Sequence, residues 1–130
     1  MAKIISFLKF IFHTSIFLLI IISLFPGRLV RLVLYEDIGR QPNLIANPFG
    51  TAINHFISYF YVSMLGLCLY LRSNNFQKLV YSLFFLSIIL EVLQLIVPKR
   101  AFEIYDVSAN FSGVLLAYLV VKIYISRRKK

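Results

Sequence analysis

Four long stretches of nearly unbroken apolar residues dominate the chain, separated by polar or Pro/Gly-containing segments. Each stretch is close to the ~20 residues that a helix needs to cross the hydrocarbon core of a bilayer. Helices are expected because a backbone surrounded by lipid must satisfy its own hydrogen bonds. The pattern predicts an all-α integral membrane bundle, a single domain over residues 1–130, with transmembrane helices at residues 4–25, 53–71, 79–97 and 107–125.

The composition agrees with a membrane protein, because 60% of the residues are hydrophobic and soluble domains are usually nearer to half. The first stretch ends at Phe25-Pro26-Gly27 without a small-residue cleavage site, which favours a retained helix over a signal peptide. The net charge of +9 would suggest nucleic-acid binding in a soluble protein. Here the cations flank the apolar stretches, so we expect them to set the membrane orientation and expect no nucleic-acid partner. Cys68 is the only cysteine, which excludes an internal disulfide.

The cations divide unequally between the two sides of the predicted bundle. If the spans alternate in direction, nine cations and no acid lie on the side of the chain ends: Lys3, Lys9, Arg72, Lys78, Lys122, Arg127, Arg128, Lys129 and Lys130. The other side has five cations accompanied by acids: Arg28, Arg31, Arg40, Lys99 and Arg100. The positive-inside rule then predicts a multi-pass protein of the inner or plasma membrane with both termini in the cytoplasm. The connections at residues 26–52 and 98–106 would face outward.

The two connections between the first three stretches differ in character. Residues 72–78 (RSNNFQK) form a short polar segment, which predicts a turn between antiparallel neighbours. The long connection begins RLVRLVLY, which is compatible with a short interfacial helix or with a plain loop. Pro42 and Pro48 argue against regular structure in the rest of it.

A few polar residues interrupt the apolar stretches, and Glu91 is the most costly of them. An ionised carboxylate inside the membrane costs ~2.5–3.5 kcal/mol by insertion scales. Polar and small residues recur at helical spacing on three predicted helices: Ser87, Glu91, Gln94 and Pro98 on the third; Asp106, Asn110, Gly113 and Ala117 on the fourth; His55, Tyr59, Val62 and Gly66 on the second. Asp106 opens its helix, where the dipole favours an anion. We therefore expect a polar cluster in the outer third of the membrane.

The order of these residues resembles the pattern of VanZ-like membrane proteins. The pattern E-x-x-Q-x-x-x-P-x-R followed by D-x-x-x-N-x-x-G is matched by Glu91, Gln94, Pro98, Arg100, Asp106, Asn110 and Gly113. HFISYF (55–60) and LFPG (24–27) extend the resemblance to roughly residues 20–120. Two positions depart from it: Asn54 stands where a basic residue often precedes the histidine, and Lys99 stands where glycine often does.

The resemblance implies a context for the cluster. The family's named member is associated with low-level resistance to teicoplanin, a lipid-tailed glycopeptide, and other members are small membrane proteins sometimes close to envelope-polysaccharide functions. We therefore expect an antibiotic-resistance or cell-envelope role, with a membrane lipid or lipid-linked envelope molecule as the partner. A membrane-protein partner or a homo-oligomer is a further possibility.

Three interpretations of the candidate site stay open. Its residues are His55, Tyr59, Glu91, Gln94, Arg100, Asp106 and Asn110. They can hydrogen-bond across helices and fix the packing, bind a polar head group, or catalyse a reaction on a lipid-linked substrate with Glu91 or Asp106 as acid or base and His55 as partner. We expect binding or packing rather than an enzyme, with no cofactor and no metal, because no HExxH or other local metal motif is present. The small residues Gly113 and Ala117 predict close helix packing.

Overall fold

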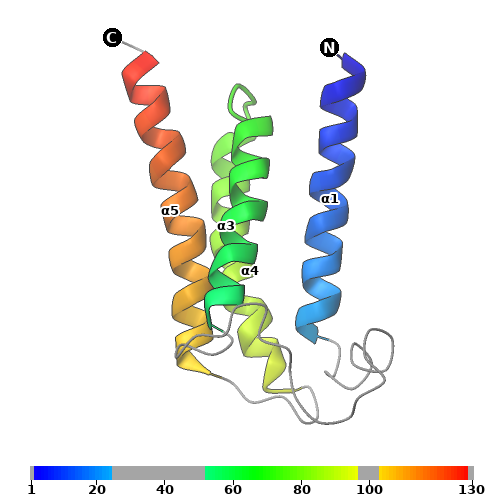
Figure 1. Cartoon of the computed structure of the whole chain (residues 1–130), viewed down its shortest axis with the longest axis vertical. Coiled ribbons are helices and arrows are strands. Elements are labelled where there is room, and N and C mark those ends of the chain that lie inside the picture. The colour runs from blue at the N-terminus through cyan, green and yellow to red at the C-terminus, as the bar shows by residue number, and fades with distance from the viewer. Residues whose placement is uncertain (1, 25–51, 97–102, 129–130) are drawn as a thin grey trace.

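The computed structural model describes residues 2–24, 52–96 and 103–128, and within these ranges the chain forms four α-helices and no strand (Figure 1). The helices are α1 (Ala2–Leu24), α3 (Ala52–Leu69), α4 (Phe76–Gln94) and α5 (Ile104–Arg128). Each of the four is long and apolar enough to cross a membrane. The prediction of an all-α, multi-pass membrane bundle is therefore confirmed.

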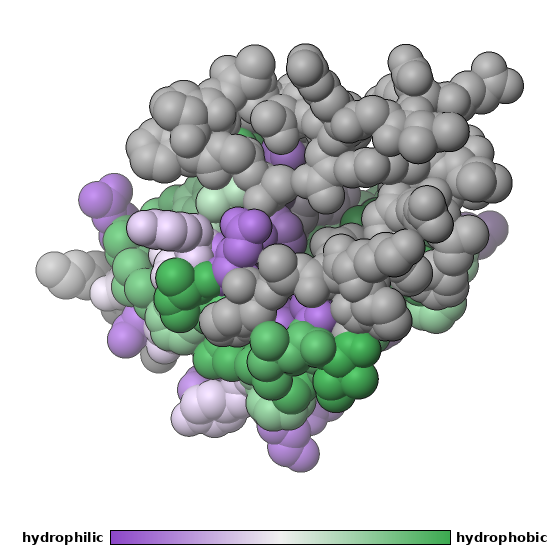
Figure 2. Space-filling view, turned by 90° about the horizontal axis from the view of Figure 1, so that it is seen from below, coloured by the Kyte–Doolittle hydropathy of each residue, from purple (hydrophilic) through white to green (hydrophobic). Residues whose placement is uncertain are grey.

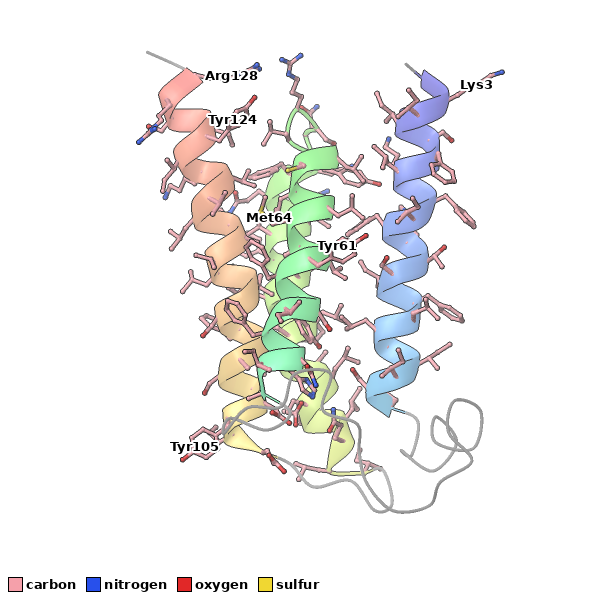
Figure 3. The ribbon with its side chains drawn as sticks, in the orientation of Figure 1. Lys3, Tyr61, Met64, Tyr105, Tyr124 and Arg128 are labelled. Carbon is pink, nitrogen blue, oxygen red and sulfur yellow. The ribbon has the colours of Figure 1, made fainter. Side chains whose placement is uncertain are left out.

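The four helices lie side by side along one axis, and both chain termini lie at the same end of the bundle (Figure 1). Lys3 and Arg128 lie at this terminal end, whereas Tyr105 lies at the opposite end, which we call the distal end (Figure 3). The most extensive contact joins α3 to α5, and α1 makes fewer contacts with its neighbours. The core of the bundle is therefore the α3–α5 interface, with α4 packed against it and α1 alongside.

Cationic side chains at or toward the terminal end stack on tyrosine rings. The Lys9 Nζ atom lies 5.3 Å from the centroid of the Tyr70 ring. The Arg128 guanidinium lies 5.2 Å from the centroid of Tyr124, and the Lys122 Nζ atom 5.6 Å from that of Tyr118. Such stacking lets a long side chain cover apolar surface while its charge reaches the head groups. The cytoplasmic location of this end stays a prediction.

The bounds of all four described helices differ from the predicted ones by one to three residues, and those of α4 and α5 differ most. The third begins at Phe76 and ends at Gln94 rather than spanning 79–97, and the fourth begins at Ile104 rather than 107. A helix can extend beyond the hydrocarbon core wherever its backbone can hydrogen-bond, which accounts for the earlier starts. At the other end of α4, the Leu95 and Ile96 amides donate to the Val92 and Leu93 carbonyls, so the chain forms a turn inside the apolar run. Because α4 ends at Gln94, Glu91 lies in its last turn, nearer to the distal end than the apolar run suggests.

The chain between α3 and α4 turns sharply, as predicted. The Ser73 amide donates to the Tyr70 carbonyl (2.9 Å), and the Phe76 amide donates to the Ser73 carbonyl (3.0 Å). The Asn75 amide donates to the Ser73 hydroxyl at 3.2 Å. These bonds reverse the chain within a few residues, so α3 and α4 are antiparallel. The long connection after Leu24, including the segment 28–35, lies outside the described residues.

A glycine brings α5 directly against α3. A Cβ atom at Gly113 would lie 2.6 Å from the Phe56 carbonyl oxygen, a distance that real Cβ atoms essentially never show, and 3.0 Å from the Phe60 amide nitrogen. Ala117, one turn further on, is fully buried. Small residues permit this approach of two helix backbones in a membrane, and it places the side chains of the first turns of α5 within reach of α3.

A second glycine, Gly66 of α3, lies where α1 packs against the bundle. The ring of Phe12, which is buried, fills the space beside Gly66 of α3, where a Cβ atom would lie 2.5 Å from the Phe12 Cε2 atom. Several other large side chains of α1 are exposed on the outside of the bundle, Phe10 and Phe17 among them. The partly buried side chains of Ile16, Leu19, Ile20 and Leu24 also pack against the core, so the Phe12 contact is one of several that hold α1 to the bundle.

Candidate functional site

His55 lies at the centre of a group of polar contacts at the distal end. It belongs to the first turns of α3, and its ring faces the first turns of α5. The Nδ1 atom is 3.1 Å from the Asn110 Oδ1 atom, and the Nε2 atom is 3.6 Å from the Asp106 Oδ2 atom. Asp106 and Asn110 are four residues apart and so lie on the same face of the helix. One imidazole ring thus contacts two polar side chains of a neighbouring helix.

The side-chain amide of Asn110 connects this contact to α4. Its Nδ2 atom donates to the Ser87 backbone carbonyl at 3.4 Å, so its Oδ1 atom is the one that faces His55. That oxygen can only accept a hydrogen bond, so the ring nitrogen that faces it must donate one. The ring proton of His55 is therefore assigned to Nδ1. A second proton on Nε2 would make the ring a cation facing the Asp106 carboxylate. Asn110, which is 1% exposed, joins α3, α4 and α5 at one point.

Asp106 lies in the first turn of α5, where the N-terminal end of the helix dipole favours a negative charge. The carboxylate is buried. The backbone amides of Asp106 and Val107 donate to the Glu103 carbonyl at 3.0 and 3.2 Å, which begins the helix at this point. The sequence predicted Asp106 at the start of this helix; the helix begins at Ile104, so Asp106 lies within its first turn.

Glu91 and Gln94 contribute a second pair of polar side chains, from the last turn of α4. Both are buried, with Glu91 at 0% exposure and Gln94 at 3%. The Gln94 Nε2 atom donates to the Glu91 Oε2 atom at 3.3 Å. The acid predicted to be costly is thus enclosed by the protein and does not face lipid, which is how membrane proteins accommodate a polar group at this depth.

Tyr59 connects these residues to α1. Its side chain is 3% exposed, and its hydroxyl neighbours the Glu91 carboxylate and Ser23 of α1. Among the described residues, the Tyr59 hydroxyl makes no hydrogen bond of regular geometry. The structure therefore places six of the seven candidate residues at the distal end, and we call them the polar cluster: His55, Tyr59, Glu91, Gln94, Asp106 and Asn110. Arg100, the seventh, lies outside the described residues.

The distal face of the molecule also has exposed hydrophilic residues. Figure 2, seen from that end, has hydrophilic residues near the middle of the face and hydrophobic residues beside them. Among the described residues no group of three His, Cys, Asp or Glu side chains could hold a metal ion. The polar cluster offers hydrogen bonding and charge pairing by one imidazole, one phenol, two carboxylates and two amides.

A groove opens beside the cluster, between α1 and α3. Its volume is about 410 Å³, within the range of roughly 300–1,000 Å³ found for ligand sites. His55 and Tyr59 belong both to the cluster and to the groove wall, and Tyr61 points from α3 toward α1 (Figure 3). Two members of the polar cluster therefore border an opening at the side of the bundle.

The sequence did not predict that α1 contributes to this wall. Ser15, Leu18, Leu19, Ile22 and Ser23 line the groove from α1. Ser15 and Ser23 are eight residues apart and so lie on one broad side of the helix, which was an available signal. That spacing identifies a face without identifying its neighbour, so the groove itself required the three-dimensional structure.

The comparisons with known proteins agree with the fold and with the motif. Searches of curated protein sequences and of solved structures found no significant match. A family model described as VanZ/LLP1 matches residues 4–125, nearly the whole chain and all four helices. The matched region includes the polar cluster, Gly113 and the groove. With the ordered motif on α4 and α5 and this match, the chain belongs to the VanZ/LLP1 family.

Proposed function

We propose that this protein binds the polar head of an envelope amphiphile through the polar cluster, and that this binding confers tolerance to a lipid-tailed glycopeptide of the teicoplanin type. A lipid-linked envelope precursor is a ligand of the same chemical class. The protein would act in the plasma or inner membrane, with the distal end facing outward. The observation that carries the proposal is the His55–Asn110–Asp106 contact, which joins buried polar groups of different helices beside an open groove.

The position of the cluster supports binding of an amphiphile. Its residues occupy the first turns of α3 and α5 and the last turn of α4, so they lie near one boundary of the predicted hydrocarbon region. A molecule with a polar head and an apolar tail is at its lowest free energy at that depth. Head-group atoms there can exchange hydrogen bonds with the imidazole, carboxylate and amide groups.

The contacts of His55 argue against the alternative of a small membrane enzyme. A general base needs a ring nitrogen within hydrogen-bond reach of the substrate proton. Here Nδ1 faces Asn110 and Nε2 faces Asp106, so both nitrogens have a protein neighbour. Packing needs no change in these contacts, whereas proton transfer by His55, like direct binding of a head group to its ring, requires one of them to open.

The test is expression of the protein in a glycopeptide-susceptible Gram-positive host at matched membrane abundance of all variants. We expect the unmodified protein to raise the inhibitory concentration of a teicoplanin-type compound several-fold, and a glycopeptide without a lipid tail to be unaffected. His55→Gln and Asp106→Asn should abolish the protection. Glu103→Gln removes an exposed acid next to the cluster and should leave it intact.

The outcome separates the remaining interpretations. Protection that survives both cluster substitutions would contradict head-group binding. Loss of protection together with loss of the folded protein would favour a purely structural role for the cluster, as in a packing subunit of a larger membrane complex. Equal protection against both glycopeptides would contradict recognition of an amphiphile.

A further inference from the structure

The groove between α1 and α3 changes in polarity along its length. α3 runs from the distal end inward and α1 runs toward it, so Asn54 and His55 of α3 and Ser23 of α1 lie at the same, distal end of the groove. Residues 54–62 of α3 and 15–23 of α1 line the groove, and each segment rises about 12 Å along its helix. The groove therefore starts beside the polar cluster and continues into the membrane.

Beyond its distal end, the groove is lined mainly by apolar side chains. Leu18, Leu19 and Ile22 of α1 and Val62 of α3 contribute to these walls, and the polar atoms among them are hydroxyl groups of serines and tyrosines. Walls that are mostly apolar favour a hydrocarbon chain over water. The molecules that surround both helices in a bilayer are hydrocarbon chains, and they match these walls.

We propose that this groove holds a single hydrocarbon chain of a membrane amphiphile, which enters sideways between α1 and α3 and lies with its polar head against His55 and Asn54. The proposal rests on the proposed function and extends it by naming the chain site and the route of entry. The continuity of the groove with the cluster carries it, because His55 and Tyr59 belong to both. The weak packing of α1 agrees with it, since only 11% of the span of this helix is buried.

The test uses the purified full chain in lipid nanodiscs that contain a small fraction of phosphatidylcholine with a diazirine in its acyl chain. After illumination, mass spectrometry of the peptides maps the labelled residues. We expect labelling to concentrate on residues 15–22 of α1 and 58–62 of α3. Lipid-facing positions elsewhere, such as Phe85 of α4 and Leu119 of α5, should be labelled several-fold less, although they are also exposed.

A matched pair of variants tests whether the groove itself causes this labelling. Ser58→Phe places a ring in the groove, whereas Ser112→Phe places the same ring on an exposed position of α5 at a comparable distance from the distal end. Groove labelling should fall several-fold in the first variant and stay unchanged in the second. Ser15→Phe fills the groove from the opposite wall and gives the same readout if Ser58→Phe does not fold.

Even labelling of all lipid-facing residues by the unmodified protein would mean ordinary annular lipid and would overturn the chain site. Groove labelling that both filling variants leave unchanged would do the same. The result is independent of the resistance assay. Even labelling combined with cluster-dependent protection overturns the chain site alone, and groove labelling combined with cluster-independent protection overturns the proposed function alone.

Discussion

Gly113 of α5 and Phe56 of α3 are in backbone contact, so closely that a Cβ atom at Gly113 would lie 2.6 Å from the Phe56 carbonyl oxygen. Phe56 follows His55, and Gly113 lies one turn beyond Asn110. The separation of the two backbones therefore fixes how closely the His55 ring and the Asn110 amide can approach. The α3–α5 interface thus determines both the packing of these two helices and the contact of His55 with Asn110.

Gly113→Ala should destabilise the protein, by ~1–3 kcal/mol, because backbone atoms cannot move aside for the added methyl group. Thermal unfolding of the purified protein in detergent measures the effect. Gly66→Ala is the matched control. The atoms that it would meet belong to the end of the Phe12 ring, which can rotate or shift, so its cost should be smaller. Equal destabilisation at the two glycines would contradict the backbone contact.

The His55–Asn110 hydrogen bond should appear as an energetic coupling between the two positions. Hydrogen bonds between membrane helices average ~0.6 kcal/mol, with a maximum of ~1.7, in double-mutant cycles. We expect a coupling in that range from the unfolding free energies of His55→Ala, Asn110→Ala and the double variant. The control cycle pairs His55→Ala with Ser108→Ala, because the Ser108 hydroxyl donates to the Ile104 carbonyl of its own helix. Coupling that is zero in both cycles would exclude the bond.

Glu91→Gln should leave the protein inserted and at least as stable, because a buried neutral amide costs less than a buried carboxylate. The resistance phenotype should nevertheless be lost if the negative charge takes part in binding. Glu103→Gln removes an exposed acid and should change neither quantity. Full protection with glutamine at position 91, at equal membrane abundance, would reject an essential charge there and leave Glu91 as a packing residue.

Arg100 and Lys99 offer a comparison that rests on the sequence, since both lie outside the described residues. A guanidinium can form two parallel hydrogen bonds with a carboxylate or phosphate, whereas an ammonium acts as a point charge. Arg100→Lys should therefore impair protection, while Lys99→Arg and Lys99→Ala are tolerated. The inhibitory-concentration assay measures the protection given by each variant. If substitutions at both positions are tolerated equally, Arg100 and Lys99 act only as an interfacial anchor.

A reporter that is active only in the cytoplasm should be active when fused after Lys130. The reason is the unequal division of cations, of which Lys3, Arg127 and Arg128 are described near the terminal end of the bundle. A reporter that requires export should be active when inserted between residues 26 and 52. Activity of the export-dependent reporter at the C-terminus would invert the proposed orientation.

The fold was largely predictable because each helix is encoded locally. An apolar run of sufficient length has few alternatives to a helix in lipid, and spacing assigned Asp106, Asn110 and Gly113 to one face. The bounds of α4 and α5 were not predictable, because Phe76 and Ile104 lie where apolar and polar surroundings meet and hydropathy changes gradually. The sequence also did not show which helix faces contact each other. Periodicity indicates that His55 and Asn110 point inward, and only the structure shows that they contact each other.

The two helices that form the main interface, α3 and α5, are far apart in the sequence. This separation affects the order in which the protein assembles during synthesis. Helices leave the ribosome in order, and α4 follows α3 through a short turn, yet the principal partner of α3 is the last helix. Until residues 104–128 have been synthesised, His55 has neither Asp106 nor Asn110 beside it. A chain that stops before α5 would therefore expose buried polar groups to lipid and become a substrate for membrane quality-control proteases. Completion of the last helix is the step that closes the bundle and creates the site at the same time.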